Sequence, residues 1–376
     1  KETVKALYGQ RLELSASQVD TQEDCRLQYF LKYGLRAKER KAAEVDPAEF
    51  GTYVHAVLEQ TGRAVMDRGG FHGVSLEDTL ALARGFADAY ARERFRDMDS
   101  QRLTYLFQRN NRELDMIVEE LWKELSAAAF QPVGFEVAFG KGGQMPAIAI
   151  PNSAMPAVLR GFVDRVDLWE DATGRFLRVT DYKTGQKKFD YCDISQGIGL
   201  QMLLYLFALG HGGGALFGEG LRPGGVEYFP ARAPYLKADA PLDPAEAEEE
   251  RVKAFSRSGL FLEDRRVLGA MEPEGLGDRL PVVEKKDGSL TGSLATSEQF
   301  RLLEGYVFHL LADMVSEIAS GSVSPNPYSR GTAHDACRFC PYAPVCHPEK
   351  EAQRRNYRAL KAQEFWEQVE KEETHG

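Results

Sequence analysis

The sequence predicts an α/β protein with a central mixed β-sheet flanked by helices. Alternating apolar and polar residues at 161–167 and 176–183 indicate two strands joined by a turn. A strand at 133–139 precedes them. A helix at 194–209 and a strand at 224–229 follow. This strand–helix–strand order requires one parallel pair beside antiparallel ones, which makes the sheet mixed.

Helices account for most of the remaining chain. A serine cap at Ser15 or Ser17 predicts a helix start. A Gly- and Pro-rich connection leads into the strand pair, and residues 256–293 have an irregular pattern. Besides 194–209, we expect helices at 18–33, 50–66, 80–95, 103–130, 241–255, 296–320 and 349–372.

The composition fits a globular protein with a large core. The chain has 376 residues, of which 43% are hydrophobic and 28% charged. Its longest apolar run, 198–209, is too short for a bilayer and no leader opens the chain, so we expect a cytoplasmic location without membrane contact. A start at Lys1 suggests a piece of a longer protein. The net charge of −10 argues mildly against nucleic acid, although a basic groove can exist on an acidic protein.

Charged residues close the second central strand. Asp181 and Lys183 share a face with the apolar residues of that strand and should lie at the edge of the core. Burial of these charges is unfavourable unless an opposite charge lies nearby. A divalent cation bound by Asp181 and by Asp164 of the neighbouring strand would neutralise both carboxylates. This layout predicts a metal-dependent phosphodiesterase.

Other polar residues allow two interpretations each. His55 shares a helix face with Gly51 and Glu59, but by itself it favours an ordinary satisfied histidine. We favour a solvent-facing Glu136, although Glu136 could join the metal site. Gln201 and Tyr205, one turn apart on an apolar helix, fit a structural hydrogen bond as well as a substrate contact.

The cysteines indicate a metal or cluster site. An odd number in a chain without a leader does not suggest disulfides. The chain contains Cys25, Cys192, Cys337, Cys340 and Cys346. The three C-terminal cysteines could bind zinc with His334 or His347 as fourth ligand, or an iron–sulfur cluster with Cys25 or Cys192. Spacing alone does not separate these alternatives, and Cys25 by itself favours a buried apolar role.

Six motifs follow one another along the chain: Cys25, Gly51-x3-His55, Gly161-Phe-Val-Asp164-Arg-Val-Asp167, Asp181-Tyr-Lys183-Thr-Gly, Gln201-x3-Tyr205 and the terminal cysteines. Their order and spacing resemble the RecB-family nucleases of the PD-(D/E)xK superfamily, in the branch with an iron–sulfur staple. The opening Leu7-Tyr8-Gly9, the run Gly-Leu-Arg-x-Lys-Glu-Arg at 34–40 and the strand at 225–230 are most similar to the C-terminal nuclease domains of the AddB type, also called RexB.

The resemblance implies a role for each matching residue. The catalytic Mg²⁺ or Mn²⁺ would be held by His55, Asp164, Asp181 and the Tyr182 carbonyl. Lys183 would orient the attacking water and offset charge on the phosphate, and Gln201 and Tyr205 would position the DNA strand. A structural [4Fe–4S] cluster would be bound by Cys25, Cys337, Cys340 and Cys346. Cys192 matches none of the family's motifs, and we expect it to be a free thiol.

The resemblance also implies the function and the organisation of the chain. It describes a metal-dependent DNA exonuclease domain that processes double-strand-break ends for recombinational repair, in a heterodimer with an AddA-like helicase–nuclease subunit. Two alternatives stay open: a non-catalytic DNA-binding or scaffold subunit with a structural iron–sulfur or zinc site, and a stand-alone RecB-like exonuclease of the CRISPR-associated type. The expected parts of this single domain are a helical part at 1–130, a nuclease core at 131–232, an insertion and helix at 233–330, and a cysteine cluster with a helix at 331–376.

Overall fold

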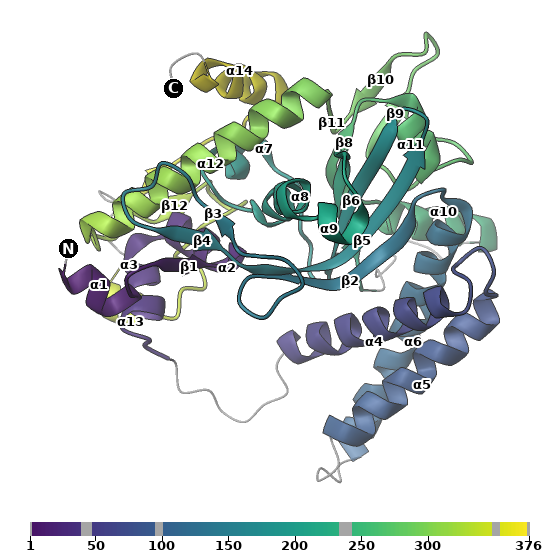
Figure 1. Cartoon of the computed structure of the whole chain (residues 1–376). Coiled ribbons are helices and arrows are strands. Elements are labelled where there is room, and N and C mark those ends of the chain that lie inside the picture. Colours follow the sequence, from purple (N-terminus) through teal and green to yellow (C-terminus); the bar gives the residue numbers. More distant parts are fainter. Residues whose placement is uncertain (1, 39–46, 95–100, 233–242, 348–353, 374–376) are drawn as a thin grey trace.

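A mixed six-stranded sheet forms the centre of the protein (Figure 1), as predicted. The computed structural model describes residues 2–38, 47–94, 101–232, 243–347 and 354–373, without the side chains of 47–48, 101–110 and 373. The strand order is β11-β8-β7-β6-β5-β2. Strands β6 and β7 are parallel, as are β8 and β11, and the other neighbours are antiparallel. The strands are β2 (Gln131–Phe139), β5 (Gly161–Asp171), β6 (Gly174–Lys183), β7 (Leu221–Pro230), β8 (Ser258–Leu262) and β11 (Leu294–Ala295).

One face of the sheet is covered by the apolar helix α8 (Gln201–Gly212). Its residues from Met202 to Leu209 are all buried, which explains its nearly uniform apolar sequence. The long helix α12 (Ser297–Ser320) packs outside α8, and α14 (Ala362–Glu373) packs on α12 (Figure 1). This face carries the main hydrophobic core.

Three helices cover the opposite face and enclose a second hydrophobic cluster. They are α4 (Pro47–Asp67), α5 (Leu76–Arg94) and α6 (Gln101–Ala127), which contact one another in sequence order. Helix α4 also contacts β2 and β5. It therefore brings His55 to the strands that carry the predicted acids.

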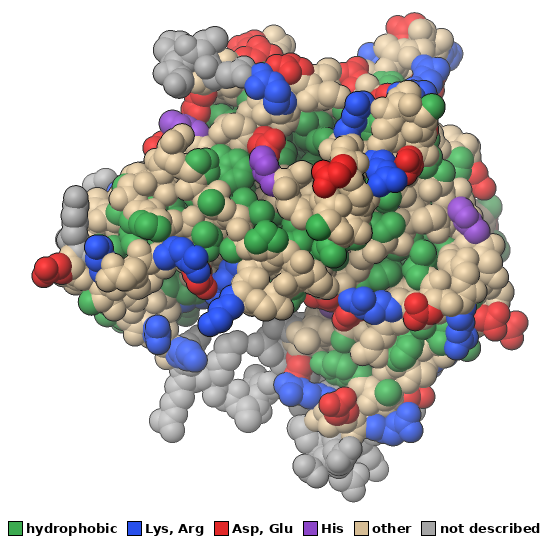
Figure 2. Space-filling model, viewed as in Figure 1, with side chains coloured by type: hydrophobic (Ala, Val, Ile, Leu, Met, Phe, Trp, Pro, Cys, Tyr) green, Lys and Arg blue, Asp and Glu red, His purple; other side chains and the backbone are tan. Residues whose placement is uncertain are grey.

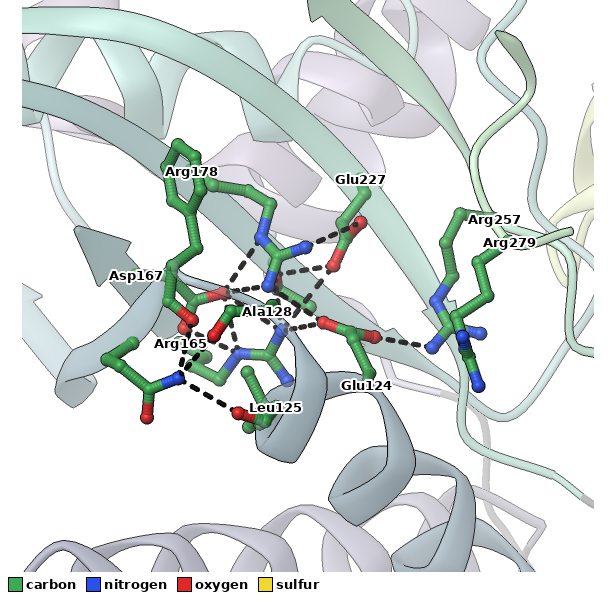
Figure 3. A network of polar contacts seen from close by, with 12 residues as sticks. Glu124, Leu125, Ala128, Arg165, Asp167, Arg178, Glu227, Arg257 and Arg279 are labelled. Carbon is green, nitrogen blue, oxygen red and sulfur yellow. Dashed lines mark hydrogen bonds and ion pairs between the residues drawn. The ribbon is translucent and has the colours of Figure 1, made fainter. Parts of the chain in front are cut away.

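A buried ion network joins α6 to three neighbouring strands (Figure 3). Arg165 of β5 contacts Glu124 of α6 at 2.9 Å and Asp167 at 2.8 Å, and Arg178 of β6 contacts Glu124 at 2.8 Å. Glu227 of β7 lies 3.5 Å from Arg165. Buried arginines are tolerated because opposite charges surround them, and loss of one partner would leave an uncompensated charge. Helix α6, for which the sequence indicated no chemistry, thus fixes the strands behind the predicted site.

The two ends of the described chain lie side by side. His334 Nε2 lies 2.9 Å from Asp24 Oδ1, and Arg26 forms an ion pair with Glu317. The N-terminal elements are α1 (Glu2–Tyr8), β1 (Leu12–Leu14), α2 (Ala16–Asp24), α3 (Arg26–Tyr29) and the π-helix η1 (Phe30–Gly34), with β1 pairing to β4 (Ala157–Leu159) and β4 to β3 (Ile148–Ala149). The C-terminal elements are β12 (Tyr328–Ser329), α13 (Ala343–Cys346) and β13 (Arg355–Asn356).

Several predicted boundaries are wrong. The helix expected at 18–33 breaks at Cys25, which is extended with φ −168°. The helix expected at 194–209 begins at Gln201, because Gly197 and Gly199 adopt positive φ and interrupt it. The final helix, expected at 349–372, begins at Ala362, because 354–361 are not helical; residues 349–353 lie outside the described part of the chain.

The segment expected to be irregular, 256–293, contains regular structure instead. It holds β8, α11 (Arg265–Met271) and the hairpin of β9 (Val282–Glu284) and β10 (Leu290–Gly292). The other short helices are α7 (Tyr191–Ser195), α9 (Gly214–Phe217) and the acidic α10 (Pro244–Ala254). Capping boxes at Ser15 and Thr296 confirm the starts of α2 and α12. Across the described residues, none of the helices has the length and apolarity needed to cross a membrane.

Candidate active site

The predicted site residues meet where β5, β6, α4 and α8 approach one another. Asp164 lies on β5, and Asp181 and Lys183 lie on β6. The two carboxylates are buried, with 8% and 1% of their surface exposed, whereas Lys183 is partly exposed. His55 reaches the same place from α4 and Gln201 from the first turn of α8.

His55 is held between Asp164 and the backbone of β6. Its Nδ1 lies 3.4 Å from Asp164 Oδ2, and its Nε2 lies 2.7 Å from the Tyr182 carbonyl oxygen. The Tyr182 N–H donates to Asp164 Oδ2 at 2.8 Å. Both ring nitrogens of His55 face oxygen acceptors. This arrangement fits a protonated imidazolium that donates from both nitrogens, and it also fits a neutral imidazole that donates from one nitrogen and binds a cation through the other.

A second chain of contacts runs through Lys183 and Gln201. Lys183 Nζ lies 2.6 Å from Asp181 Oδ2 and donates to Gln201 Oε1 at 3.2 Å. The Gln201 amide donates to Asp181 Oδ1 at 2.8 Å and to the Tyr205 hydroxyl at 3.2 Å. The structure therefore favours a common site for Gln201 and Tyr205 with the acids, rather than an isolated helix hydrogen bond.

The carboxylates of the site outnumber its cationic side chains. Burial and the nearby Asp164 raise the pKa of Asp181 to about 6, although Lys183 opposes this shift. Burial lowers the pKa of His55, but its contacts with Asp164 outweigh burial and the net shift is upward. The negative potential is thus concentrated between β5 and β6.

Glu136 belongs to this site, and the expectation that it faces solvent is wrong. Glu136, His55 and Asp164 each present a ligand atom, and these atoms lie within 4.8 Å of one another. Burial, with Asp164 and Glu59 nearby, raises the pKa of Glu136 to about 7. Its φ of 48° is uncommon for a non-glycine residue. The sequence pattern could not show that the packing of α4 on β2 brings His55 close to this carboxylate.

The donor set fits a divalent cation. Asp164 and Glu136 offer carboxylates, Tyr182 offers a carbonyl oxygen and His55 offers a ring nitrogen. Asp181 Oδ2 is buried and accepts no hydrogen bond of acceptable geometry, although Lys183 Nζ lies 2.6 Å away. Carboxylate and carbonyl oxygens are the ligands that Mg²⁺ and Mn²⁺ prefer.

An open pocket of about 650 Å³ gives access to these residues. Its lining includes Asp164, Gln201 and Tyr205 on one side and Arg160 and Lys141 on another. Phe162, two residues before Asp164 on the same strand, also lines the pocket and is 60% exposed. The pocket is open to solvent, and its lining holds the cations Lys141 and Arg160 as well as acids.

The four cysteines of the predicted cluster line one pocket. Cys25 comes from the break between α2 and α3, and the others come from the loop around α13: Cys337, Cys340 and Cys346. Burial raises the pKa of each of these three thiols, and the nearby Cys25 adds to the effect. Among the described residues, no three cysteine sulfurs lie within 4.8 Å of one another.

The alternative fourth ligands lie elsewhere. His334 contacts Asp24 at 2.9 Å and Asp193 at 3.5 Å, and neither His334 nor His347 lines the cysteine pocket. Cys192 is buried apart from the pocket and its thiol donates to the Arg358 carbonyl oxygen at 3.0 Å.

Comparisons with known proteins show which family the chain belongs to. The sequence profile of the PD-(D/E)XK nuclease superfamily matches residues 13–347. Proteins named as the B-type subunit of an ATP-dependent helicase/deoxyribonuclease are similar over nearly the whole chain. The protein of Acetivibrio thermocellus is 33% identical over 99% of this chain, that of Clostridium novyi 32% over 99%, and that of Desulforudis audaxviator 34% over 97%. The chain spans 33%, 34% and 32% of these relatives. The chain belongs to the PD-(D/E)XK nuclease superfamily.

Proposed function

We propose that this chain is a metal-dependent DNA exonuclease domain of a helicase–nuclease subunit of the AddB type. The observation that carries this proposal is the contact of His55 with Asp164 next to the buried pair of Asp181 and Lys183, because Asp164 is near enough to raise the pKa of Asp181. The names of the relatives support a deoxyribonuclease subunit. We treat residues 1–376 as one nuclease domain, because elements from both ends of the chain surround the same sheet.

The proposed metal ligands are His55, Asp164, Asp181 and the Tyr182 carbonyl. A bound Mg²⁺ or Mn²⁺ would activate water and neutralise charge on a phosphodiester. Glu136 lies beside Asp164 and is the carboxylate placed to receive the proton that the attacking water loses. The new bond joins the water oxygen to phosphorus, and the bond to one sugar oxygen breaks and that oxygen takes up a proton.

Lys183 is the cation that faces the reacting phosphate in this proposal. Gln201 holds Lys183 through its Oε1 and holds Asp181 through its amide. Tyr205 fixes Gln201 from one turn further along α8. Gln201 and Tyr205 thus orient the lysine and the acid, and they line the pocket that the DNA strand would enter.

We assign Cys25, Cys337, Cys340 and Cys346 to a structural [4Fe–4S] cluster. The four thiols line one pocket, which supports a site with four cysteine ligands. A cluster at this pocket would connect the N-terminal helices to the C-terminal loop.

The larger biological role follows the names of the relatives. These names describe an ATP-dependent helicase, so we propose a heterodimer with an AddA-like helicase–nuclease subunit that delivers a DNA single strand to this domain. Processing of double-strand-break ends for recombinational repair is the role we infer for that assembly.

Cleavage of DNA tests the proposal. We expect anaerobically purified protein to degrade end-labelled single-stranded DNA in Mg²⁺ and to stop on addition of EDTA, because the buried carboxylates need the cation to bind phosphate. Product lengths on a denaturing gel measure the reaction. Folded protein that binds DNA but does not cleave it in Mg²⁺ or Mn²⁺ would favour the non-catalytic subunit instead.

A further inference from the structure

A second groove, of about 750 Å³, opens beside the active-site pocket. It runs between α1, η1 and the loop that carries Tyr342. Glu13 and Arg160 line both the groove and the active-site pocket. The two hollows therefore meet at Arg160, only four residues before the predicted metal ligand Asp164.

Tyrosine rings form much of this second groove. Tyr8 and Tyr29 have ring centroids 5.7 Å apart, and Tyr29 and Tyr33 have centroids 5.2 Å apart. Tyr342 closes the other side and donates its hydroxyl to the Ala37 carbonyl oxygen at 2.8 Å. Tyr8, Tyr33 and Tyr342 are only half-buried, so each keeps ring surface accessible from the groove.

The rest of the groove is strongly cationic on a protein whose net charge is −10. Lys32, Arg36, Lys38 and Arg160 line it and are exposed. Within the described part of the chain, these four side chains form no ion pair with an acid. The acid that lines the groove, Glu13, is paired with Arg11 at 2.8 Å. Figure 2 shows Lys and Arg side chains gathered over this part of the molecule, near α1 and α13.

Phe162 adds an aromatic side chain at the active-site end. Phe162 and Asp164 project from the same face of β5, because side chains alternate along a strand. An exposed phenylalanine has no packing role that explains it, whereas a base stacked on its ring would cover that apolar surface. Aromatic rings are thus present at both ends of a path whose middle is Arg160.

We propose that this groove is a single-strand track, through which an unpaired nucleic-acid strand passes from the tyrosines across Arg160 and Phe162 to the carboxylates. The inference rests on the proposed nuclease function and names the path of its substrate. Alternating cations and exposed rings are the combination that binds single strands, since the cations follow the phosphates and each base offers a face for stacking. A paired duplex presents its bases to one another and leaves none for the rings.

The role of the groove's cations is tested by measuring single-strand binding under conditions in which no cleavage occurs. We would measure the anisotropy of a fluorescein-labelled oligothymidine of about 20 nucleotides in EDTA, as a function of salt, because a single-strand site covers ~4–16 nucleotides. Each phosphate contact contributes ~0.7 to the slope of log K against log salt for single strands. The double variant Lys32→Ala/Arg36→Ala should therefore lower this slope by about 1.4. The control Lys285→Ala/Lys286→Ala removes the same charge from the exposed β9–β10 turn and should leave the slope unchanged.

The tyrosines are tested by a different signature. Tyr33→Ala should weaken binding at least about five-fold through loss of base stacking, with no change in the salt slope. Tyr33→Phe keeps the ring and should restore the affinity. A merely structural Tyr33 would affect thermal unfolding and would not distinguish oligothymidine from a blunt duplex of equal length.

The outcomes separate this inference from the proposed function. If the two alanine substitutions and Tyr33→Ala leave affinity and salt slope at wild-type values while Mg²⁺-dependent cleavage persists, the track is overturned and the nuclease stands. If the variants lose single-strand binding as expected while the wild type does not cleave in Mg²⁺, the track stands and the nuclease proposal fails. Polyglutamate is added as a competitor in the same assay. If it displaces the oligothymidine, and the protein binds single strand and duplex equally well, the track is overturned in favour of an acidic peptide site.

Discussion

Replacement of Lys183 by Met should slow the cleavage of single-stranded DNA by about 100-fold to 1,000-fold, the range observed when one preorganised group that stabilises a transition state is removed. Methionine keeps the length of the side chain and removes its charge. Lys183 is partly exposed at the end of β6, and bound Mg²⁺ would neutralise the buried Asp181, so the loss of Lys183 should leave the fold intact when Mg²⁺ is present. The reaction is measured as single-turnover cleavage of an end-labelled strand at saturating Mg²⁺.

The matched control is Lys286→Met in the exposed turn between β9 and β10, which removes the same charge far from β6 and should cleave at the wild-type rate. The thermal unfolding temperature of both variants should equal that of the wild type. Wild-type cleavage by Lys183→Met would remove this lysine from the proposed chemistry.

Replacement of Cys25 by Ser should abolish the proposed iron–sulfur cluster and destabilise the region where the two chain ends meet. Cys25 is the ligand from the N-terminal part, whereas the other three lie in one loop. Metal binding of this kind contributes directly to folding, because the site does not exist in the unfolded chain. The wild type, purified anaerobically, should contain about four iron atoms per chain and absorb visible light.

Cys192→Ser is the control for this experiment. Cys192 is as buried as Cys25, but its thiol donates to the Arg358 carbonyl oxygen, and a serine hydroxyl can make the same contact. Iron content should therefore persist in Cys192→Ser and disappear in Cys25→Ser, with a lower unfolding temperature in the latter. Equal iron content in the two variants would exclude Cys25 as a ligand.

The local pattern of the sequence was enough to predict the centre of the fold. Period-two alternation in β5 and β6 arises because one face of the sheet packs on the apolar core and the other carries the buried ion network. The same alternation placed Asp181 and Lys183 on one face. The strand–helix–strand order predicted the parallel pair of β6 and β7. The mixed sheet is confirmed for these physical reasons.

Features that depend on distant contacts could not be predicted in this way. Glu124 of α6 resembles any exposed helical glutamate in sequence, and only the approach of Arg165 and Arg178 explains its burial. Glu136 has the sequence pattern of a solvent-facing strand residue, and only the packing of α4 on β2 brings His55 close to it. The break at Cys25 likewise has no glycine or proline to announce it.

The groove beside the active site is a third feature that the sequence alone could not predict. Lys32, Tyr33 and Arg36 are far in sequence from Arg160 and Phe162, and the sequence alone indicated only a net charge of −10. The pairing of β1 with β4 brings the N-terminal segment next to Arg160. A local basic groove on an acidic protein thus requires the tertiary structure to be recognised.

Binding of Mn²⁺ measured by calorimetric titration tests the central claim most directly. The wild type should bind a divalent cation at the site of His55, Asp164 and Asp181, and Asp181→Asn should weaken this binding by at least about ten-fold, because one ligand loses its charge. Lys183→Met should retain the affinity, as should Asp287→Asn in the exposed β9–β10 turn. Undiminished Mn²⁺ affinity in Asp181→Asn would contradict the metal site and, with it, the proposed nuclease chemistry.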